Sequence, residues 1–175
     1  SVEAYDPQLG AWALVASMGW GCFAHASVVL DGKIYVMGGF GAGFGAGVLD
    51  TVEVYDPQAD SWQQVASMPR GLMSHAAAAM GGKIYVTGGG YTPGSSVSSL
   101  CVYDPQANAW TQLASMSTAR QLHTSAAVGG KLYVFGGSGA EGNLDTAEVY
   151  DPALDGWAQM TSLTSSRNSM VAIAL

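Results

Sequence analysis

A short motif recurs four times along the chain, and its regular spacing constrains the fold more than any other feature. Tyr-Asp-Pro stands at Tyr5–Pro7, Tyr55–Pro57, Tyr103–Pro105 and Tyr150–Pro152, so successive copies lie 50, 48 and 47 residues apart. A tryptophan follows each of these tyrosines by seven positions. A period near 50 residues is typical of architectures in which each repeat is one supersecondary unit that packs on its neighbours. The sequence therefore predicts an array of similar units.

Each complete unit also contains Gly-Lys, then a short apolar run, then Gly-Gly. The Gly-Lys pairs begin at Gly32, Gly82 and Gly130, and the Gly-Gly pairs begin at Gly38, Gly88 and Gly136. The segments between these signals are short, rich in Val, Ile and Tyr, and bounded by Gly, Pro or Asp, as short antiparallel strands require. We therefore predict an all-β fold with four strands, named A to D, in each unit.

The expected bounds follow from these signals. Strand A spans His25–Leu30, His75–Met80 and Leu122–Val128, and strand B spans Lys33–Met37, Lys83–Thr87 and Lys131–Phe135. Strand C spans Thr51–Tyr55, Leu100–Tyr103 and Thr146–Tyr150, and strand D spans Trp62–Met68, Trp110–Met116 and Trp157–Leu163. Partial units flank these three, with strands C and D at Val2–Tyr5 and Trp12–Met18 and a last strand A at Ser169–Leu175. Ala76–Ala79 has high helix propensity, but the run is short and Gly81–Gly82 follows it, which favours a strand.

Taken together, Tyr-Asp-Pro, the spaced Trp, Gly-Lys-Ile-Tyr-Val and Gly-Gly resemble Kelch repeats, and the resemblance covers almost the whole chain. The sequence is similar in particular to the Kelch domain of Kelch-like substrate-adaptor proteins. The resemblance implies a β-propeller in which strand A lines the channel, strand D faces outward, and the B–C and D–A loops form the ligand-binding face. Residues 1–175 are then one propeller segment, with units at about 1–18, 19–68, 69–116, 117–163 and 164–175.

The number of units leaves the ring incomplete. Kelch propellers usually have six blades, which at this period need about 290 residues, whereas the chain has 175. Three outcomes remain open: a segment of a longer propeller, two or more copies that complete one ring, or a small irregular four-bladed propeller that closes alone.

Composition excludes several function classes. The net charge of −7 argues against a nucleic-acid binder that neutralises phosphates, and the apolar runs are too short for a membrane helix. Cys22 and Cys101 fall in different contexts, so a disulfide is not expected, and free thiols fit a reducing compartment. No Asn-x-Ser/Thr site occurs. We expect an intracellular protein, in the cytoplasm.

Arginines are the candidate charged contacts. Arg120 and Arg167 each lie four residues after the expected end of a strand D, where, by resemblance to Kelch domains, an arginine often lines the ligand-binding mouth. The planar guanidinium suits carboxylates of a partner, so an acidic peptide is a candidate ligand. Arg70 lies near the same rim. The alternative is a structural arginine that binds loop carbonyls.

Aromatic and other apolar loop residues are the candidate apolar contacts. Phe40, Phe44 and Tyr91 lie in the B–C loops, which vary most among the units, and Trp20 lies in the first D–A loop. Apolar loop residues of this kind anchor a partner, or else cover an edge of the core. The same two readings apply to the other unusual residues of the first and second D–A loops, namely Cys22, Phe23, Leu72 and Met73.

The histidines do not predict a metal site. His25, His75 and His123 occupy one repeat position, so rotation about the axis spreads them, whereas ligation needs nitrogens within ~2.0–2.1 Å of one ion. We expect no cofactor, no metal and no catalytic residue, and interpret the chain as a non-catalytic protein-interaction scaffold. Two alternatives remain: a fragment of a Kelch-type copper or iron enzyme, and a structural unit that self-assembles.

Overall fold

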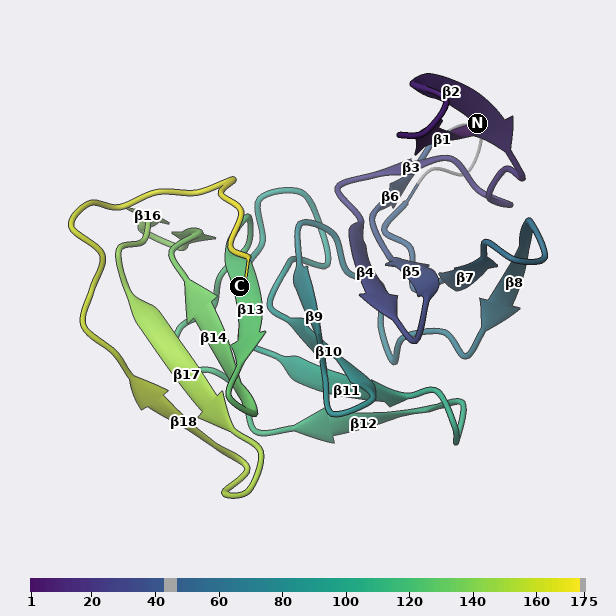
Figure 1. The fold of residues 1–175 in the computed structure, drawn as a ribbon. Coiled ribbons are helices and arrows are strands. Elements are labelled where there is room, and N and C mark those ends of the chain that lie inside the picture. Colours follow the sequence, from purple (N-terminus) through teal and green to yellow (C-terminus); the bar gives the residue numbers. More distant parts are fainter. Residues whose placement is uncertain (43–46, 174–175) are drawn as a thin grey trace.

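Three four-stranded antiparallel sheets, arranged as blades, make up most of the computed structural model, which describes residues 1–42 and 47–173 (Figure 1). Blade 1 contains β4 (Ala26–Leu30), β5 (Lys33–Met37), β7 (Val52–Asp56) and β8 (Ser61–Val65). Blade 2 contains β9 (Ala76–Met80), β10 (Lys83–Thr87), β11 (Leu100–Asp104) and β12 (Ala109–Leu113). Blade 3 contains β13 (Thr124–Val128), β14 (Lys131–Phe135), β17 (Ala147–Asp151) and β18 (Gly156–Gln159). The expected order A-B-C-D is confirmed in all three blades.

Shorter pairings complete the architecture. A hairpin of β1 (Val2–Asp6) and β2 (Ala11–Val15) precedes blade 1. Two-residue strands lie in the loops, namely β3 (Cys22–Phe23) paired with β6 (Phe40–Gly41), and β15 (Ser138–Gly139) paired with β16 (Gly142–Asn143). None of the described residues form a helix long and apolar enough to cross a membrane.

The turn between strands A and B has the geometry that its sequence predicts. In blade 1, Asp31 and Gly32 both have positive φ, 51° and 73°, as a type I′ hairpin turn requires. The Asp56 carboxylate of Tyr-Asp-Pro accepts a backbone hydrogen bond from Gln58 at 2.9 Å, as expected for a turn cap. The lysine after the A–B turn forms an ion pair of 2.9 Å with this aspartate in every blade: Lys33–Asp56, Lys83–Asp104 and Lys131–Asp151.

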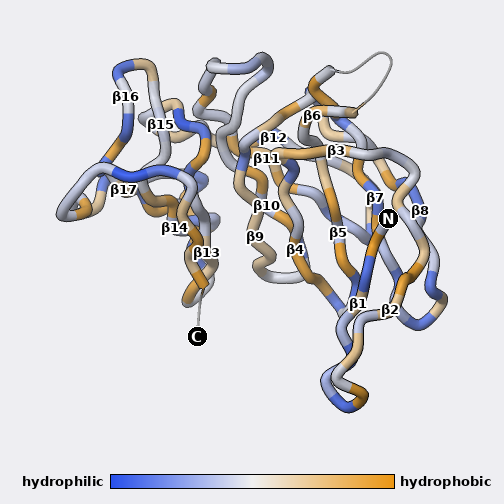
Figure 2. Tube along the Cα trace, turned by 90° about the horizontal axis from the view of Figure 1, so that it is seen from above, coloured by the Kyte–Doolittle hydropathy of each residue, from blue (hydrophilic) through white to orange (hydrophobic). Residues whose placement is uncertain are grey.

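Small and β-branched residues build the core. The alanine-rich β9 is a strand, as predicted, and it packs between β4 and β13 near the centre of the arc. Behind these inner strands, Val52, Ile84, Leu100 and Leu132 are completely buried. Figure 2 shows the hydrophobic stretches along β4, β5, β13 and β14.

A repeated clasp joins each blade to the one before it. The indole Nε1 of Trp62 donates to the carbonyl of Ala16 at 2.7 Å, and the Asp60 carboxylate accepts from the amide of the same alanine at 2.8 Å. The spacing of seven residues makes Tyr55 and Trp62 cross-strand partners in one hairpin, and the indole of Trp62 then binds the preceding hairpin. The clasp recurs when Trp110 and Asn108 bind Ala66, and when Trp157 and Asp155 bind Ala114.

The structure corrects the predicted ends of strand D. The D strands of blades 1 and 2 end at Val65 and Leu113 rather than at Met68 and Met116. At the end of the blade-1 strand, both backbone groups of Ala66 bind the next blade. The chain then turns toward the next strand A, and the Met68 amide donates to the carbonyl of Asp50 at 2.8 Å. The other predicted D strands are also shorter, ending at Val15 rather than Met18 and at Gln159 rather than Leu163.

The predicted last strand A is wrong over residues 169–173, which form no strand. Ser169 keeps the entry geometry of a blade, with φ of 53° and a hydrogen bond of 2.8 Å from its amide to the Leu122 carbonyl. In every complete blade the ladder partner of strand A is the following strand B, and residues 169–173 pair with no strand. Ala174 and Leu175, the last two residues of the predicted strand, lie outside the described residues.

The blades lie along an open arc, with the β1–β2 hairpin at one end and blade 3 at the other (Figure 1). The described residues thus do not form the closed four-bladed ring that was one of the three expected outcomes. Residues that face a neighbouring blade elsewhere are uncovered at the ends. Trp12 is 67% exposed, whereas its counterparts in the three blades are half-buried.

Candidate binding face

One backbone pairing in each blade joins the loop between strands D and A to the loop between strands B and C. The paired residues are Phe23 with Phe40, Met73 with Gly90, and Gln121 with Ser138. We call the surface formed by these loops the mouth. It is the surface on which the sequence places all the candidate binding residues.

An aromatic cluster occupies the mouth at blade 1. The rings of Phe23 and Phe40 lie 5.5 Å apart between centroids, and Phe23 is 57% exposed. Trp20, in the same D–A loop, is 59% exposed. The candidates Trp20 and Phe40 therefore lie on one loop pair, together with Phe23. Exposed aromatic side chains are the residues that most often dominate protein interfaces.

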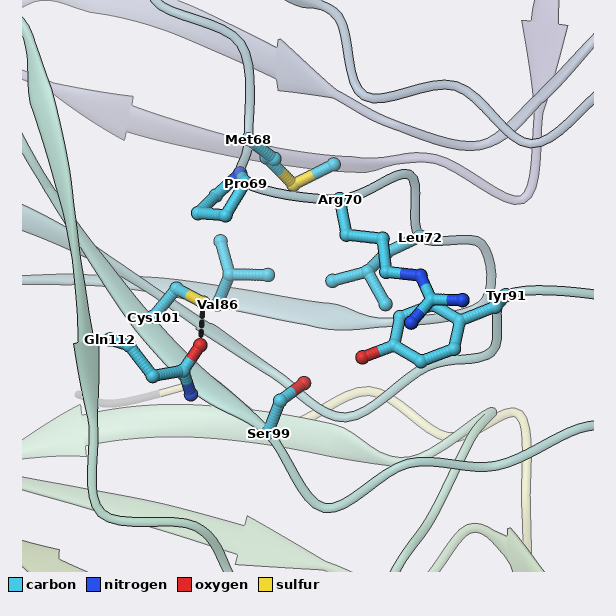
Figure 3. A pocket seen from close by; sticks show the side chains of 9 residues that line it. All are labelled: Met68, Pro69, Arg70, Leu72, Val86, Tyr91, Ser99, Cys101 and Gln112. Atoms are coloured by element: carbon cyan, nitrogen blue, oxygen red, sulfur yellow. Dashed lines mark hydrogen bonds between the residues drawn. The ribbon is translucent and has the colours of Figure 1, made fainter.

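An arginine stacked on a tyrosine occupies the mouth at blade 2. The guanidinium carbon of Arg70 lies 3.7 Å from the centroid of the Tyr91 ring (Figure 3). Such stacking is attractive and fixes the planar group in one orientation. Arg70 is exposed and Tyr91 is half-buried, so the stack faces solvent. The structure thus brings together two of the candidates, from the D–A loop and the B–C loop.

A small cavity lies beside this stack. The thiol of Cys101 donates to Oε1 of Gln112 at 3.2 Å, and Nε2 of Gln112 donates to the carbonyl of Leu100 at 2.9 Å. Burial raises the pKa of the Cys101 thiol, so the group is a neutral wall of the cavity and not a thiolate nucleophile. The cavity volume is about 30 Å³, and its walls include Met68, Leu72, Val86, Ser99 and Cys101 as well as Arg70 and Tyr91 (Figure 3).

Arg120 does not have the position expected of a contact residue. It is completely buried, and its Nη2 forms an ion pair of 2.8 Å with Oε1 of Glu148. Its Nη1 donates to the carbonyls of Gly136 at 2.6 Å and Thr146 at 3.1 Å. These partners enclose the guanidinium, so the alternative of a structural arginine that binds loop carbonyls describes Arg120.

Arg167 occupies the equivalent position after blade 3 but is exposed. Its amide donates to the carbonyl of Leu144 at 3.1 Å, as the amide of Arg120 does to Val97. Its guanidinium Nη2 donates to Oγ of Ser165 at 2.6 Å. No carboxylate pairs with Arg167 among the described residues. Phe44, the remaining candidate, lies outside the described residues.

The two apolar residues of the second D–A loop belong to the core. Leu72 and Met73 are 4% and 9% exposed, so they cover a core edge rather than project toward a partner. Sequence reasoning missed the cavity that Leu72 and Cys101 create. The sequence did contain a signal for it. Leu72 and Cys101 of blade 2 occupy the positions that Arg120 and Glu148 occupy in blade 3, where the two side chains form an ion pair.

The histidines line the inner side of the arc. His75 and His123 are buried between blades, and Nε2 of His123 lies 2.9 Å from Oγ1 of Thr87. A Cβ on Gly88, whose φ is +56°, would lie 2.6 Å from Cε1 of His123, so the glycine leaves room for the ring. Burial lowers the pKa of His75 to about 4 and that of His123 to about 3. Among the described residues, no group of three or more His, Cys, Asp or Glu is placed to hold a metal ion.

Comparisons with known proteins agree with the fold. The model of the "KLHDC2/KLHL20/DRC7 Kelch-repeats domain" family matches residues 24–173. A 41-residue stretch, 23% of the chain, is 46% identical to human Kelch-like protein 33 and spans 8% of that protein. A solved structure titled "Structure of YjhT" superposes with a TM-score of 0.85 at 19% identity, over 97% of this chain and 64% of that one. The chain therefore spans less than two thirds of the length of either protein.

Proposed function

Because the chain belongs to the KLHDC2/KLHL20/DRC7 Kelch-repeats domain family, we propose that it is a non-catalytic module that binds a segment of a partner protein at its mouth. The Kelch propeller fold supports a role in protein interaction in general. The observation that carries the specific proposal is the grouping of aromatic and guanidinium groups on the D–A and B–C loops of blades 1 and 2. The contact residues are Trp20, Phe23, Phe40, Arg70 and Tyr91.

The charges at the mouth favour an acidic partner segment. All three lysines pair with aspartates at the A–B turns, and Arg120 pairs with Glu148. Arg70 and Arg167 have no carboxylate partner among the described residues, and both are exposed. A partner carboxylate would gain a charge-assisted hydrogen bond to either guanidinium. In this proposal the chain recognises substrates as part of an adaptor, in the cytoplasm, where its two free cysteines stay reduced.

The ends of the arc support a second proposal, that copies of the chain associate through their uncovered blade faces. Trp12 and Leu14 are exposed at one end, and Val128 and Ile173 at the other. Uncovered apolar faces and strand edges favour association. Native mass spectrometry of the purified chain tests this. Masses of two or more chains support it, and a monomer at all concentrations contradicts it.

Selection of peptides tests binding at the mouth. We would display random 12-residue peptides against the whole chain and measure the affinity of the selected peptides by fluorescence anisotropy. Phe40→Ala and Trp20→Ala should each weaken binding by about tenfold or more, because each removes a large anchor. Leu154→Ala is the matched control, because Leu154 is 78% exposed but lies in the turn between β17 and β18.

Two results would count against this function. Equal affinities for all three variants and the wild type would overturn binding at the mouth. A stoichiometric transition metal in the purified protein would favour the enzyme alternative.

A further inference from the structure

Blades 2 and 3 have the same backbone around one side-chain position. The carbonyl of Leu72 accepts from Gly39 at 2.8 Å, and the carbonyl of Arg120 accepts from Gly89 at 2.9 Å. The amides of both residues donate to the preceding B–C loop at 3.1 Å. Opposite them, Cys101 pairs with Gln112 in the β-ladder as Glu148 pairs with Gln159. Leu72 and Cys101 of blade 2 therefore occupy the same backbone positions as Arg120 and Glu148 of blade 3.

The side chains fill this position to different extents. In blade 3 the guanidinium of Arg120 reaches the carbonyls of Gly136 and Thr146 and the carboxylate of Glu148. Leucine is shorter than arginine, and a thiol is smaller than a carboxylate. The result in blade 2 is the cavity of about 30 Å³ between Leu72, Val86, Ser99 and Cys101, which we call the blade-2 slot.

The slot differs from a buried packing defect because a fixed cation lies at its edge. Arg70 and Tyr91 both line the slot, where the guanidinium stacks on the ring (Figure 3), and Arg70 is exposed. No carboxylate of the described residues pairs with Arg70. A group that enters the slot is therefore adjacent to an oriented and unpaired positive charge.

We propose that the blade-2 slot takes a small aliphatic side chain of a partner segment while Arg70 binds the carboxylate of an adjacent Asp or Glu of that segment. The volume of the slot limits the size of the side chain that can enter. One water needs a cavity of about 10–15 Å³, so the slot of about 30 Å³ accommodates a side chain such as that of Ala or Val but not a ring. The charge of Arg70 sets the second requirement. This inference rests on the proposed function and assigns the chemistry of the bound segment.

The slot is tested with the selected 12-residue peptides on the whole chain. We expect enrichment of Asp or Glu next to Ala or Val. Arg70→Gln, which removes the charge and keeps a polar side chain, should weaken binding by about tenfold. The double variant Leu72→Arg with Cys101→Glu, which rebuilds the blade-3 pair and fills the slot, should weaken binding by a similar factor. Lys83→Gln is the control, because it removes a charge from the A–B turn of the same blade.

A double-mutant cycle assigns the contact. Glu→Gln or Asp→Asn in the peptide should weaken binding to the wild type but not to Arg70→Gln, because the partner charge is then absent. Circular dichroism and thermal melts confirm that each variant folds. A milder variant, Ser99→Thr, narrows the slot by one methyl group and should weaken binding of the same peptides.

The outcomes separate the two proposals. Peptides that lose affinity with Phe40→Ala but not with Arg70→Gln or the slot variants would overturn this inference and leave the mouth as the binding face. Selected peptides without a carboxylate would also overturn it. If no peptide binds the chain, the proposed function itself fails.

Discussion

Blades 2 and 3 show how one backbone frame serves two purposes. In blade 3 the D–A loop that leads into strand A holds Arg120, which is completely buried and binds Glu148 and two carbonyls. In blade 2 the same position holds Leu72, and a cavity remains beside the exposed stack of Arg70 on Tyr91. The arginine in blade 3, Arg120, is thus buried, whereas the arginine in blade 2, Arg70, is exposed to solvent. A blade can lose its internal ion pair because the clasps and the backbone ladders, which do not use the side chains of Arg120 and Glu148, hold the strands in place.

Breaking the buried ion pair of blade 3 should have the largest effect on the free energy of unfolding. Glu148→Ala leaves the buried guanidinium of Arg120 without its carboxylate, and removal of one partner of a buried pair costs about 3–5 kcal/mol. We expect the free energy of unfolding in urea to fall by about that amount. The double variant Arg120→Leu with Glu148→Cys copies blade 2 and should recover the part of the loss that comes from the unpaired guanidinium, but not the part from the Ser117 and Thr118 amides that donate to Glu148. A double variant no more stable than Glu148→Ala would show that blade 3 cannot adopt the blade-2 solution.

Acid should weaken the contacts of blade 2 with blade 1 and with blade 3. The pKa values of His75 and His123 in the folded protein, about 4 and about 3, lie below the ordinary value of 6.5 because the rings are buried. The unfolded chain therefore binds protons first, so stability is complete above pH 6.5 and falls as the pH drops. Each histidine should contribute a loss of about 2 kcal/mol by pH 5. Urea midpoints at pH 7, 6 and 5 measure the slope, and His75→Gln should reduce it by about half. An unchanged slope in that variant would assign the acid sensitivity to other groups.

Removing one indole donor should have a smaller effect. Trp110→Phe deletes the bond from Nε1 to the carbonyl of Ala66. An unmade hydrogen bond of a buried group costs about 1–3 kcal/mol. Trp12→Phe is the matched control, because Trp12 is 67% exposed. Equal losses for both variants, measured by urea unfolding, would show that the bond between blades contributes nothing.

The smallest effect is expected at the A–B turns. Lys83→Gln removes one partner of the ion pair with Asp104, whose side chains are 45% and 32% exposed. Exposed pairs contribute little and are screened by salt. The urea midpoint should stay within measurement error in low salt. A clear decrease that salt abolishes would show that these turns stabilise the blades.

Sequence reasoning found the local features and missed the contacts between blades. The A–B hairpins were predictable because Asp31–Gly32 and its counterparts carry the residues that positive φ requires. The ends of the D strands were not, because the bonds of Ala66 to Asn108 and Trp110 join residues more than 40 positions apart. Arg120 and Arg167 look alike in sequence, and only the burial of Arg120 beside Glu148 separates them.

The candidate site was predictable in part. The repeat pattern located the loops, and the unusual residues Trp20, Phe40, Arg70 and Tyr91 stood out against it. The stack of Arg70 on Tyr91 was not predictable, because it depends on the path of a B–C loop whose sequence differs from those of the other blades. The contact of Phe23 with Phe40 was not predictable for a related reason, since it depends on a pairing of two loops across the mouth.

The clasp between blades has a consequence for how such a chain can be altered. It uses only the amide and the carbonyl of one alanine, and its donor and acceptor come from the strand D hairpin of the next blade. The clasp does not involve the loops at the mouth, where separate backbone bonds join neighbouring blades, as when the Leu72 amide donates to the carbonyl of Leu49. A B–C loop transplanted from one blade to another should therefore keep its orientation toward the mouth if it retains the carbonyl that accepts from the next D–A loop, the role of Leu49, Val97 and Leu144.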